Sequence, residues 1–229
     1  MDKTAHKIGE LNESGQVEVI EKATSFKGYF QVDTYRFRHS LFKGGLSQEV
    51  QREIFERGHA AAVLPFDHKS GEIILIEQFR PGAFAASQAP WLLEVVAGII
   101  EENENPEELS HREAMEEAGC TLGRLKKIGT FLMTPGGSSE TITLFCGEIL
   151  DHKKQDSYGL DHEGEDIRTH TMKAEQGFKL MSEGKITNAI TAIACNVKNQ
   201  PLVWSTPSAI KSAGKLFLNS FSFSKGKCC

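Results

Sequence analysis

The chain has 229 residues, of which 39% are hydrophobic and 25% are charged, a balance typical of a globular protein with one buried core and an extension. Its formal net charge of −5 argues against nonspecific binding to nucleic acid, and no apolar run approaches the roughly 18 residues of a membrane helix. The polar start MDKTAHKIGE lacks the apolar core of a signal peptide, so we expect a cytoplasmic protein that binds neither nucleic acid nor membrane.

Residues 1–45 predict a distinct N-terminal β unit. Two strand-like segments meet near residues 26–28, and YRFRHSLF alternates large apolar and basic residues before a turn at Gly44 and Gly45. Such an antiparallel piece exposes a pairing edge unless another surface covers it, and oligomerisation would provide that cover. The alternative is that these segments form a simple edge of the main sheet.

Alternating or β-rich segments recur along the chain and predict strands. We expect strands at Val17 to Ala23, Tyr29 to Leu41, Ala60 to Phe66, Ile73 to Phe79, Leu93 to Val96, Ile128 to Met133, Thr141 to Leu150 and Ile167 to Met172. Helical patterns occupy Glu107 to Ala118, Ala174 to Ser182 and Asn188 to Lys198. This order favours an α+β sandwich over residues 46–200. Residues 201–229 form a C-terminal extension of unknown role, with a short helix expected from Pro207 to Leu218.

The segment GIIEENENPEELSHREAMEEAGC carries the strongest chemical signal. Between residues 101 and 117 it holds eight glutamates and one arginine, and Pro106 and Gly119 suit the first turn and the end of a helix. Glu113, Glu116 and Glu117 are spaced to project toward one side of that helix, where like charges repel.

A cation would relieve this repulsion. All the candidate ligands are oxygens, which suits a hard divalent ion such as Mg²⁺, and Mg²⁺ commonly meets protein through a few carboxylates together with substrate phosphates. The alternative is a solvated acidic face, but that reading does not explain the spacing of Gly98, Arg112 and Gly119.

The same segment follows the pattern Gly-x5-Glu-x7-Arg-Glu-U-x-Glu-Glu-x-Gly-U, in which U is a bulky apolar residue. Its fixed positions are filled by Gly98, Glu104, Arg112, Glu113, Glu116, Glu117 and Gly119. Ala114 and Cys120 are undersized at the two U positions. The chain therefore resembles the Nudix hydrolases, which cleave a nucleoside diphosphate linked to another moiety.

This resemblance implies an α/β/α sandwich and a role for each matched residue. Glu113 and Glu117 would bind metal, and the carbonyl of Ala97 would complete the metal site. Arg112 would orient carboxylates by ion pairing, and Glu116 would be a further ligand or a support.

A narrower resemblance, over about residues 29–197, is to the bacterial ADP-ribose pyrophosphatases. Pro135 stands sixteen residues after Gly119, and the surrounding TPGGSSE, the upstream IEQFRPGAF and the downstream GLDHEGEDIRTH also look like these enzymes. The resemblance implies hydrolysis of ADP-ribose to AMP and ribose 5-phosphate with two or three Mg²⁺ ions, or Mn²⁺ in their place. Glu163 would be the general base and Glu165 an additional metal ligand. The alternative is that both lie on an acidic surface loop.

The resemblance also implies a homodimer in which an N-terminal strand reaches the partner's site. The residues that would bind substrate are Tyr29, Phe30, Arg52 and Glu53 at adenine, Arg57 and Arg80 at the phosphates, and Thr134, Pro135, Gly136 and Glu140 at the terminal ribose. Plain alternatives are core packing for the two aromatic residues and surface ion pairs for the arginines. Two rival functions stay open: a pyrophosphohydrolase selective for another sugar nucleotide such as GDP-mannose, and a noncatalytic ADP-ribose sensor, which would typically have lost glutamates of this segment.

Overall fold

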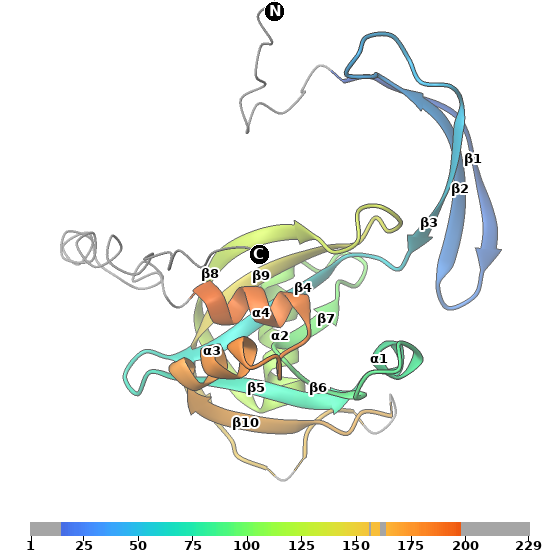
Figure 1. Cartoon of the computed structure of the whole chain (residues 1–229). Helices are drawn as coiled ribbons and strands as arrows, with labels where there is room; N and C mark the ends of the chain where they lie inside the picture. The colour runs from blue at the N-terminus through green and yellow to red at the C-terminus, as the bar shows by residue number, and fades with distance from the viewer. Residues whose placement is uncertain (1–14, 156, 161–163, 198–229) are drawn as a thin grey trace, which may run out of the picture. The chain divides into compact units, whose positions relative to one another are not determined.

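The computed structural model describes residues 15–155, 157–160 and 164–197 (Figure 1). Glu163 and the helix expected from Pro207 to Leu218 therefore lie outside the described residues. By its internal contacts the chain divides into two compact units. The strand unit comprises the described residues up to Gly58 together with Leu132–Glu140, and the sandwich unit comprises the rest of the described chain. The domain boundaries expected at residues 45 and 200 stay predictions.

The strand unit is an antiparallel sheet of three strands in the order β1 (Val17–Lys27), β2 (Gln31–His39) and β3 (Val50–Glu56). β3 also meets the second segment of this unit, because the Phe55 N–H donates to the Gly137 carbonyl at 2.8 Å. An N-terminal antiparallel unit is thus confirmed, although the sequence pattern did not predict β3. The segment VQREIFE hides its alternation because charged residues stand in its middle and at its C-terminal end.

Apolar side chains of the strand unit are not collected into a core. Within its described residues no apolar side chain is buried, and Val17, Val19 and Phe26 are each more than half exposed. The one fully buried side chain is instead Asp33, which accepts hydrogen bonds from Thr24 and Gln31 and pairs with Lys22. Three-stranded sheets generally need a covered apolar face for stability, so this sheet requires a surface to pack against.

The sandwich unit is built on a mixed sheet (Figure 1). Its main path runs through β10 (Arg168–Lys173), β5 (Glu72–Phe79), β4 (Ala60–Asp67), β9 (Thr141–His152) and β8 (Cys120–Leu132). β4 and β9 are parallel, whereas β4 and β5, and β5 and β10, are antiparallel. Two short strands pair beside this path, β6 (Trp91–Glu94) with β5 and β7 (Val96–Ile99) with β4.

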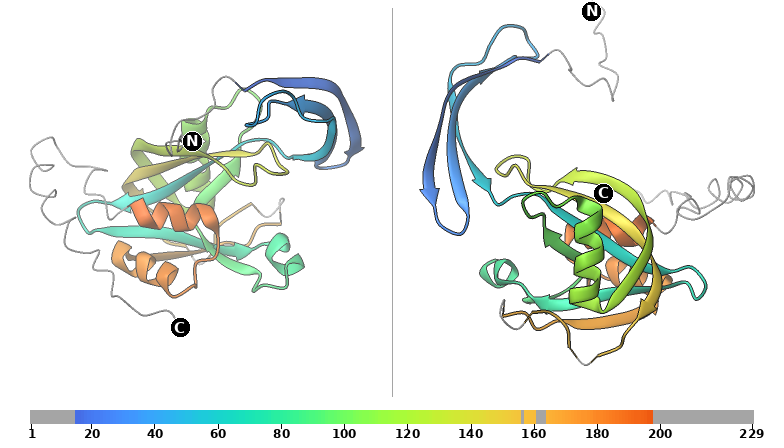
Figure 2. Two further views of the ribbon diagram at one scale, coloured as in Figure 1. Left: turned by 45° about the horizontal axis from the view of Figure 1, so that its top comes forward. Right: turned by 180° about the vertical axis from the view of Figure 1, so that it is seen from behind.

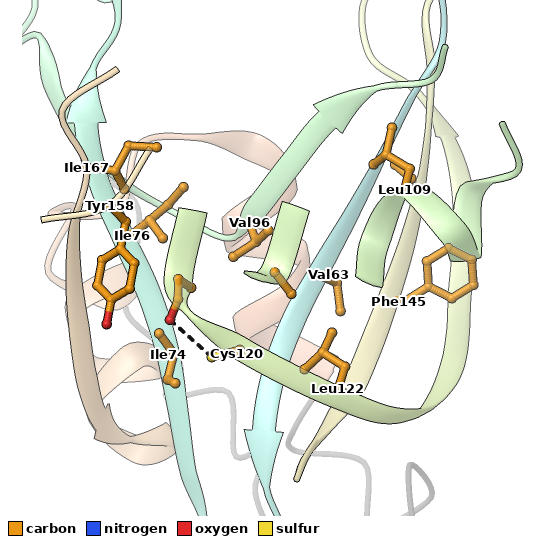
Figure 3. Packing of buried hydrophobic residues seen from close by; sticks show 13 residues of the cluster. Val63, Ile74, Ile76, Val96, Leu109, Cys120, Leu122, Phe145, Tyr158 and Ile167 are labelled. Atoms are coloured by element: carbon orange, nitrogen blue, oxygen red, sulfur yellow. Dashed lines mark hydrogen bonds between the residues drawn. The ribbon is translucent and has the colours of Figure 1, made fainter. Parts of the chain in front are cut away.

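Helices cover both faces of this sheet. α2 (Pro106–Ala118) lies on one face, and α3 (Ala174–Ser182) and α4 (Ala189–Val197) lie on the other (Figure 2). The α2 side packs a cluster that includes Val63, Ile74, Ile76, Val96 and Leu109 (Figure 3). Each such side chain contributes roughly 1.5–3 kcal/mol when fully buried. These layers confirm the predicted α+β sandwich.

Three local features differ from the sequence-based expectations. The predicted strand from Leu93 to Val96 is in fact two strands, because Val95 lies between β6 and β7, where the chain changes its neighbour from β5 to β4. β8 begins at Cys120 instead of Ile128, since Lys126 and Lys127 obscure its alternation. The one-turn helix α1 (Pro81–Ala85) is too short to show a helical period. No helix in the described part of the chain is both long and apolar enough to cross a membrane.

Candidate active site

Helix α2 carries the candidate metal ligands, and its ends are fixed by local chemistry. Asn105 caps the N-terminus by accepting from the N–H groups of Glu107 and Glu108, while the Glu108 side chain accepts from the Asn105 N–H. Pro106 occupies the first turn, and Gly119 ends the helix with a left-handed φ of 58°. The predicted boundary roles of Pro106 and Gly119 are confirmed.

Glu117 and Glu113 lie against β7. Glu117 is only 3% exposed, and its Oε2 accepts a hydrogen bond of 3.1 Å from the Ala97 N–H. Ala97 sits opposite Ala62 in the antiparallel pair of β7 and β4, where the N–H and C=O of one residue point to the same side. The Ala97 carbonyl is therefore also turned away from β4 toward the α2 side.

Gly98 makes the close approach of Glu113 sterically feasible. A Cβ atom at this position would lie 2.0 Å from the Glu113 Oε1 and 2.6 Å from its Cδ. Any side chain at residue 98 would therefore push the Glu113 carboxylate away from β7.

Arg112 gathers three carboxylates of the motif. Its guanidinium donates to both oxygens of Glu104, at 2.9 and 3.2 Å, and its Nη1 donates to Glu113 and Glu116, each at 3.0 Å. Hydrogen bonding to Arg112 lowers the pKa of Glu104, and the same bonds raise the pKa of Arg112. Arg112 thus stays charged and fixes how these carboxylates are oriented.

The two carboxyls nearest β7, Glu113 and Glu117, have raised pKa values, whereas the pKa of Glu104 is lowered. Burial raises the pKa of Glu113 and raises the pKa of Glu117 well above its usual range, and repulsion from neighbouring carboxylates adds to each shift, while the charge of Arg112 opposes the shift of Glu113. The Ala97 N–H and the charge of Arg80 act in the opposite direction on Glu117. A buried carboxylate beside a partly buried one is stable as an anion only next to a further cation.

These residues fit a divalent ion whose remaining ligands come from substrate and water. Among the described residues no group of three or more His, Cys, Asp or Glu side chains is assembled to hold a metal alone. The oxygens of the buried Glu117, the partly buried Glu113 and the Ala97 carbonyl suit Mg²⁺, which keeps several waters and binds through a few carboxylates plus phosphate oxygens.

Glu165 lies near this centre, since its charge also raises the pKa of Glu113 and Glu117. Its Oε2 accepts from the Leu160 N–H at 3.2 Å. The residues before Glu165 contact α2, because the Gly159 N–H donates to the Glu116 carbonyl. The neighbouring buried Tyr158 pairs with Ile167. Glu163, the expected general base, is outside the described residues.

Arg80 approaches the same centre from the end of β5. Its Nε donates to the Glu94 Oε2 at 2.7 Å, and Glu94 is 3% exposed. The surface ion pair considered from the sequence is therefore a pair between a half-buried arginine and a buried carboxylate.

The remaining predicted substrate residues belong to the strand unit. Tyr29 is 89% exposed and Phe30 is also exposed, so core packing fits neither residue. The two rings contact each other edge to face. Arg57 stands over the Phe30 ring and lies 3.4 Å from Glu140. The others are exposed: Arg52 and Glu53 on β3, and Thr134, Pro135 and Gly136 in a turn. The structure thus brings Tyr29, Phe30, Arg57 and Glu140 into one group within this unit.

Two residues of the site had no role assigned from the sequence. Glu104 occupies a fixed position of the motif, and this position could have indicated that Glu104 pairs with Arg112. Glu94 is a single carboxylate in the apolar run WLLEVV, and a charged residue in such a run indicates a buried partner.

The fold and the site define an α+β sandwich in which one capped helix holds paired carboxylates for a divalent ion. The NUDIX domain model matches residues 56–184, and the chain belongs to this family. The match confirms the resemblance drawn from the sequence.

Individual relatives extend the comparison to most of the chain. The ADP-ribose pyrophosphatase of Escherichia coli (strain K12) is 50% identical over 178 residues, covering 78% of this chain and 85% of that protein. The ADP-ribose pyrophosphatase of Haemophilus influenzae is 40% identical over 180 residues, covering 77% and 83%. The GDP-mannose pyrophosphatase of Pectobacterium atrosepticum is 30% identical over 179 residues, covering 78% and 91%.

Proposed function

We propose that this protein hydrolyses the pyrophosphate bond of ADP-ribose with water, giving AMP and ribose 5-phosphate. The observation that carries the reaction type is the buried Glu117 beside the partly buried Glu113 on the helix of a Nudix domain. The substrate is supported by the 50% identity to the E. coli ADP-ribose pyrophosphatase.

Mg²⁺ is the cofactor that we propose, as two or three ions, with Mn²⁺ as a substitute. Glu113, Glu117, Glu165 and the Ala97 carbonyl would hold it. When bound, the metal supplies positive charge that neutralises the pyrophosphate and stabilises the developing oxyanions.

The chain's own residues then have separate tasks. Arg112 keeps Glu104, Glu113 and Glu116 in fixed orientations. Glu163 would accept the proton of the attacking water, following its position in the bacterial enzymes. Arg80 would donate to the pyrophosphate from its terminal nitrogens, because its Nε is occupied by Glu94.

Adenine recognition is assigned to the strand unit. The exposed rings of Tyr29 and Phe30 suit stacking on a base, which contributes roughly 1–3 kcal/mol. Arg52 and Glu53 would hydrogen-bond the base, Arg57 would contact a phosphate, and the Thr134, Pro135, Gly136 and Glu140 group would shape the terminal-ribose pocket.

A homodimer is proposed because the strand unit needs cover. Its described apolar side chains are not buried, and all of β1 is exposed. A second copy of the same sheet is self-complementary and would cover this face in a closed, two-fold assembly. We also propose a cytoplasmic location, which fits the buried thiols of Cys120 and Cys195.

GDP-mannose is the second candidate substrate, since a GDP-mannose pyrophosphatase is also a relative, at 30% identity. The noncatalytic sensor is disfavoured because all the glutamates of the motif are present.

A substrate panel tests the proposal. Phosphate release, coupled to a phosphatase, is measured for ADP-ribose, ADP-glucose, GDP-mannose and NADH, with and without Mg²⁺. We expect Mg²⁺-dependent release that is fastest for ADP-ribose. Fastest release from GDP-mannose would replace the proposed substrate, and absence of release from all four would contradict an enzymatic function.

A further inference from the structure

Asn188 lies just before α4 and has two hydrogen-bonding tasks. Its Oδ1 accepts from the Thr191 N–H at 3.1 Å and from the Thr191 hydroxyl at 3.2 Å, which caps the helix. Its Nδ2 donates to the Glu94 Oε1 at 2.7 Å. The capping task involves only the oxygen, so the amide nitrogen serves Glu94 alone.

Glu94 connects this helix end to Arg80. One oxygen accepts from Asn188 and the other accepts from the Arg80 Nε, each at 2.7 Å. Because the Glu94 side chain is 4% exposed, water cannot replace either donor easily. The carboxylate is therefore held in one orientation by a donor on each side.

The consequence for Arg80 is a fixed guanidinium. With Nε bonded to Glu94, the two terminal nitrogens have no hydrogen-bond partner among the described residues and are left to bind a ligand. Arg80 is also close enough to the metal-ligand helix for its charge to act on Glu117. An arginine held in this way loses less side-chain entropy when it binds a phosphate.

We propose that Asn188 is a positioning residue for the pyrophosphate of the substrate, acting through Glu94 on the guanidinium of Arg80. This inference rests on the proposed function, and it adds a residue from the opposite face of the sheet to the substrate site. The helix α4 thereby becomes part of the binding apparatus.

Two substitutions separate the tasks of Asn188. Asn188→Ser keeps an oxygen that can cap α4 but removes the amide nitrogen that donates to Glu94. Asn188→Asp also keeps the cap and places a second carboxylate beside Glu94, so it serves as an independent variant if the serine protein does not fold. Thr191→Val is the matched control, because it removes the Thr191 hydroxyl, which accepts from the Val95 N–H, and leaves the Asn188 amide nitrogen in place.

We expect Asn188→Ser to raise KM for ADP-ribose roughly 5-fold with kcat changed less than about 2-fold, and Asn188→Asp to raise KM further. The Kd of the uncleavable α,β-methylene analogue of ADP-ribose, measured by calorimetry, should rise by the same factor. Thr191→Val should lower Tm and leave KM and Kd unchanged.

The decisive comparison uses Arg80→Ala as background. If Asn188 acts through Arg80, Asn188→Ser adds no further increase in KM or Kd when Arg80 is already alanine. An equal increase in both backgrounds, no increase in either, or the same KM increase in Thr191→Val would overturn the inference while the wild type still cleaves ADP-ribose. A wild type that neither cleaves ADP-ribose nor binds the analogue would refute the proposed function, and the inference with it.

Discussion

At the scale of single residues, the absence of one Cβ atom decides how the candidate site is built. Gly98 leaves the space that the Glu113 carboxylate occupies, since an added Cβ would lie 2.0 Å from Oε1. This contact links a backbone position on β7 to a candidate metal ligand on α2. Steric fit at one residue is therefore as important here as the charges.

Gly98→Ala should lower kcat/KM for ADP-ribose by roughly 10²-fold or more, because displaced ligands disturb the geometry of the reacting groups. Steady-state phosphate release measures the effect. Gly82→Ala is the control, as nothing lies within 4 Å of an added Cβ there. Unchanged activity in Gly98→Ala would show that Glu113 works equally well in another position.

Glu117→Gln should abolish turnover and remove the increase in Tm that Mg²⁺ gives the wild type. The glutamine keeps an oxygen for the Ala97 N–H but loses the buried charge that needs a cation. Scanning calorimetry with Mg²⁺ and with a chelator gives both values. An undiminished Mg²⁺ effect in the variant would remove Glu117 from the metal site.

We expect the stability of the folded protein to depend on pH through His152. Burial lowers the pKa of this imidazole below its ordinary 6.5, and its Nε2 is buried without a hydrogen-bond partner among the described residues. Between the folded and unfolded pKa values the unfolded state binds more protons, so the contribution of His152 to stability is present above about pH 6.5 and is lost as pH falls through that window. The Tm of the wild type should therefore fall more steeply with acid than the Tm of His152→Gln. Parallel curves would contradict this.

At the scale of secondary-structure elements, α2 depends on the cap that precedes the motif. Asn105 and Glu108 satisfy N–H groups at the helix start through a reciprocal pair of hydrogen bonds. The carboxylates of α2 are spaced so that they repel one another, and the side chains of the helix therefore contribute little to its stability.

Asn105→Ala should lower the free energy of unfolding by about 1 kcal/mol, because the cap is lost. Asn105→Ser, which can cap in the same way, should stay close to the wild type. Urea unfolding monitored by circular dichroism compares the three proteins, and equal midpoints for all of them would show that the cap is dispensable.

Some secondary-structure elements could be predicted from the sequence and others could not. Pro106, Gly119 and the glutamates between them are local signals with fixed spacing, so α2 and its acidic face could be predicted. β3 and the break at Val95 could not, because each depends on which strand lies alongside. The same limit applies to Glu94 and Asn188, which meet across 94 residues of sequence and share no local pattern.

At the scale of the whole molecule, the exposed strand unit is the reason that we expect a homodimer. A sheet whose only fully buried side chain is Asp33 gains little from hydrophobic burial within one copy. The proposed homodimer accounts for the exposed apolar residues of β1 without assigning them another role.

Val19→Lys should therefore shift the protein from a mass of two chains to a mass of one, since a charge would be placed at the covered face. Light scattering after gel filtration measures the mass. Lys27→Gln, at the end of the same strand, is the control and should leave the mass unchanged. A wild type with the mass of one chain at all concentrations would contradict the homodimer.

The change of strand partner at Val95 has one more consequence. The Val95 N–H is bonded to the Thr191 hydroxyl on α4 instead of to a neighbouring strand. Its hydrogen can be exchanged with solvent only when that helix lifts from the sheet. The deuterium uptake of this single amide therefore reports how often the helical layer formed by α3 and α4 separates from the sheet.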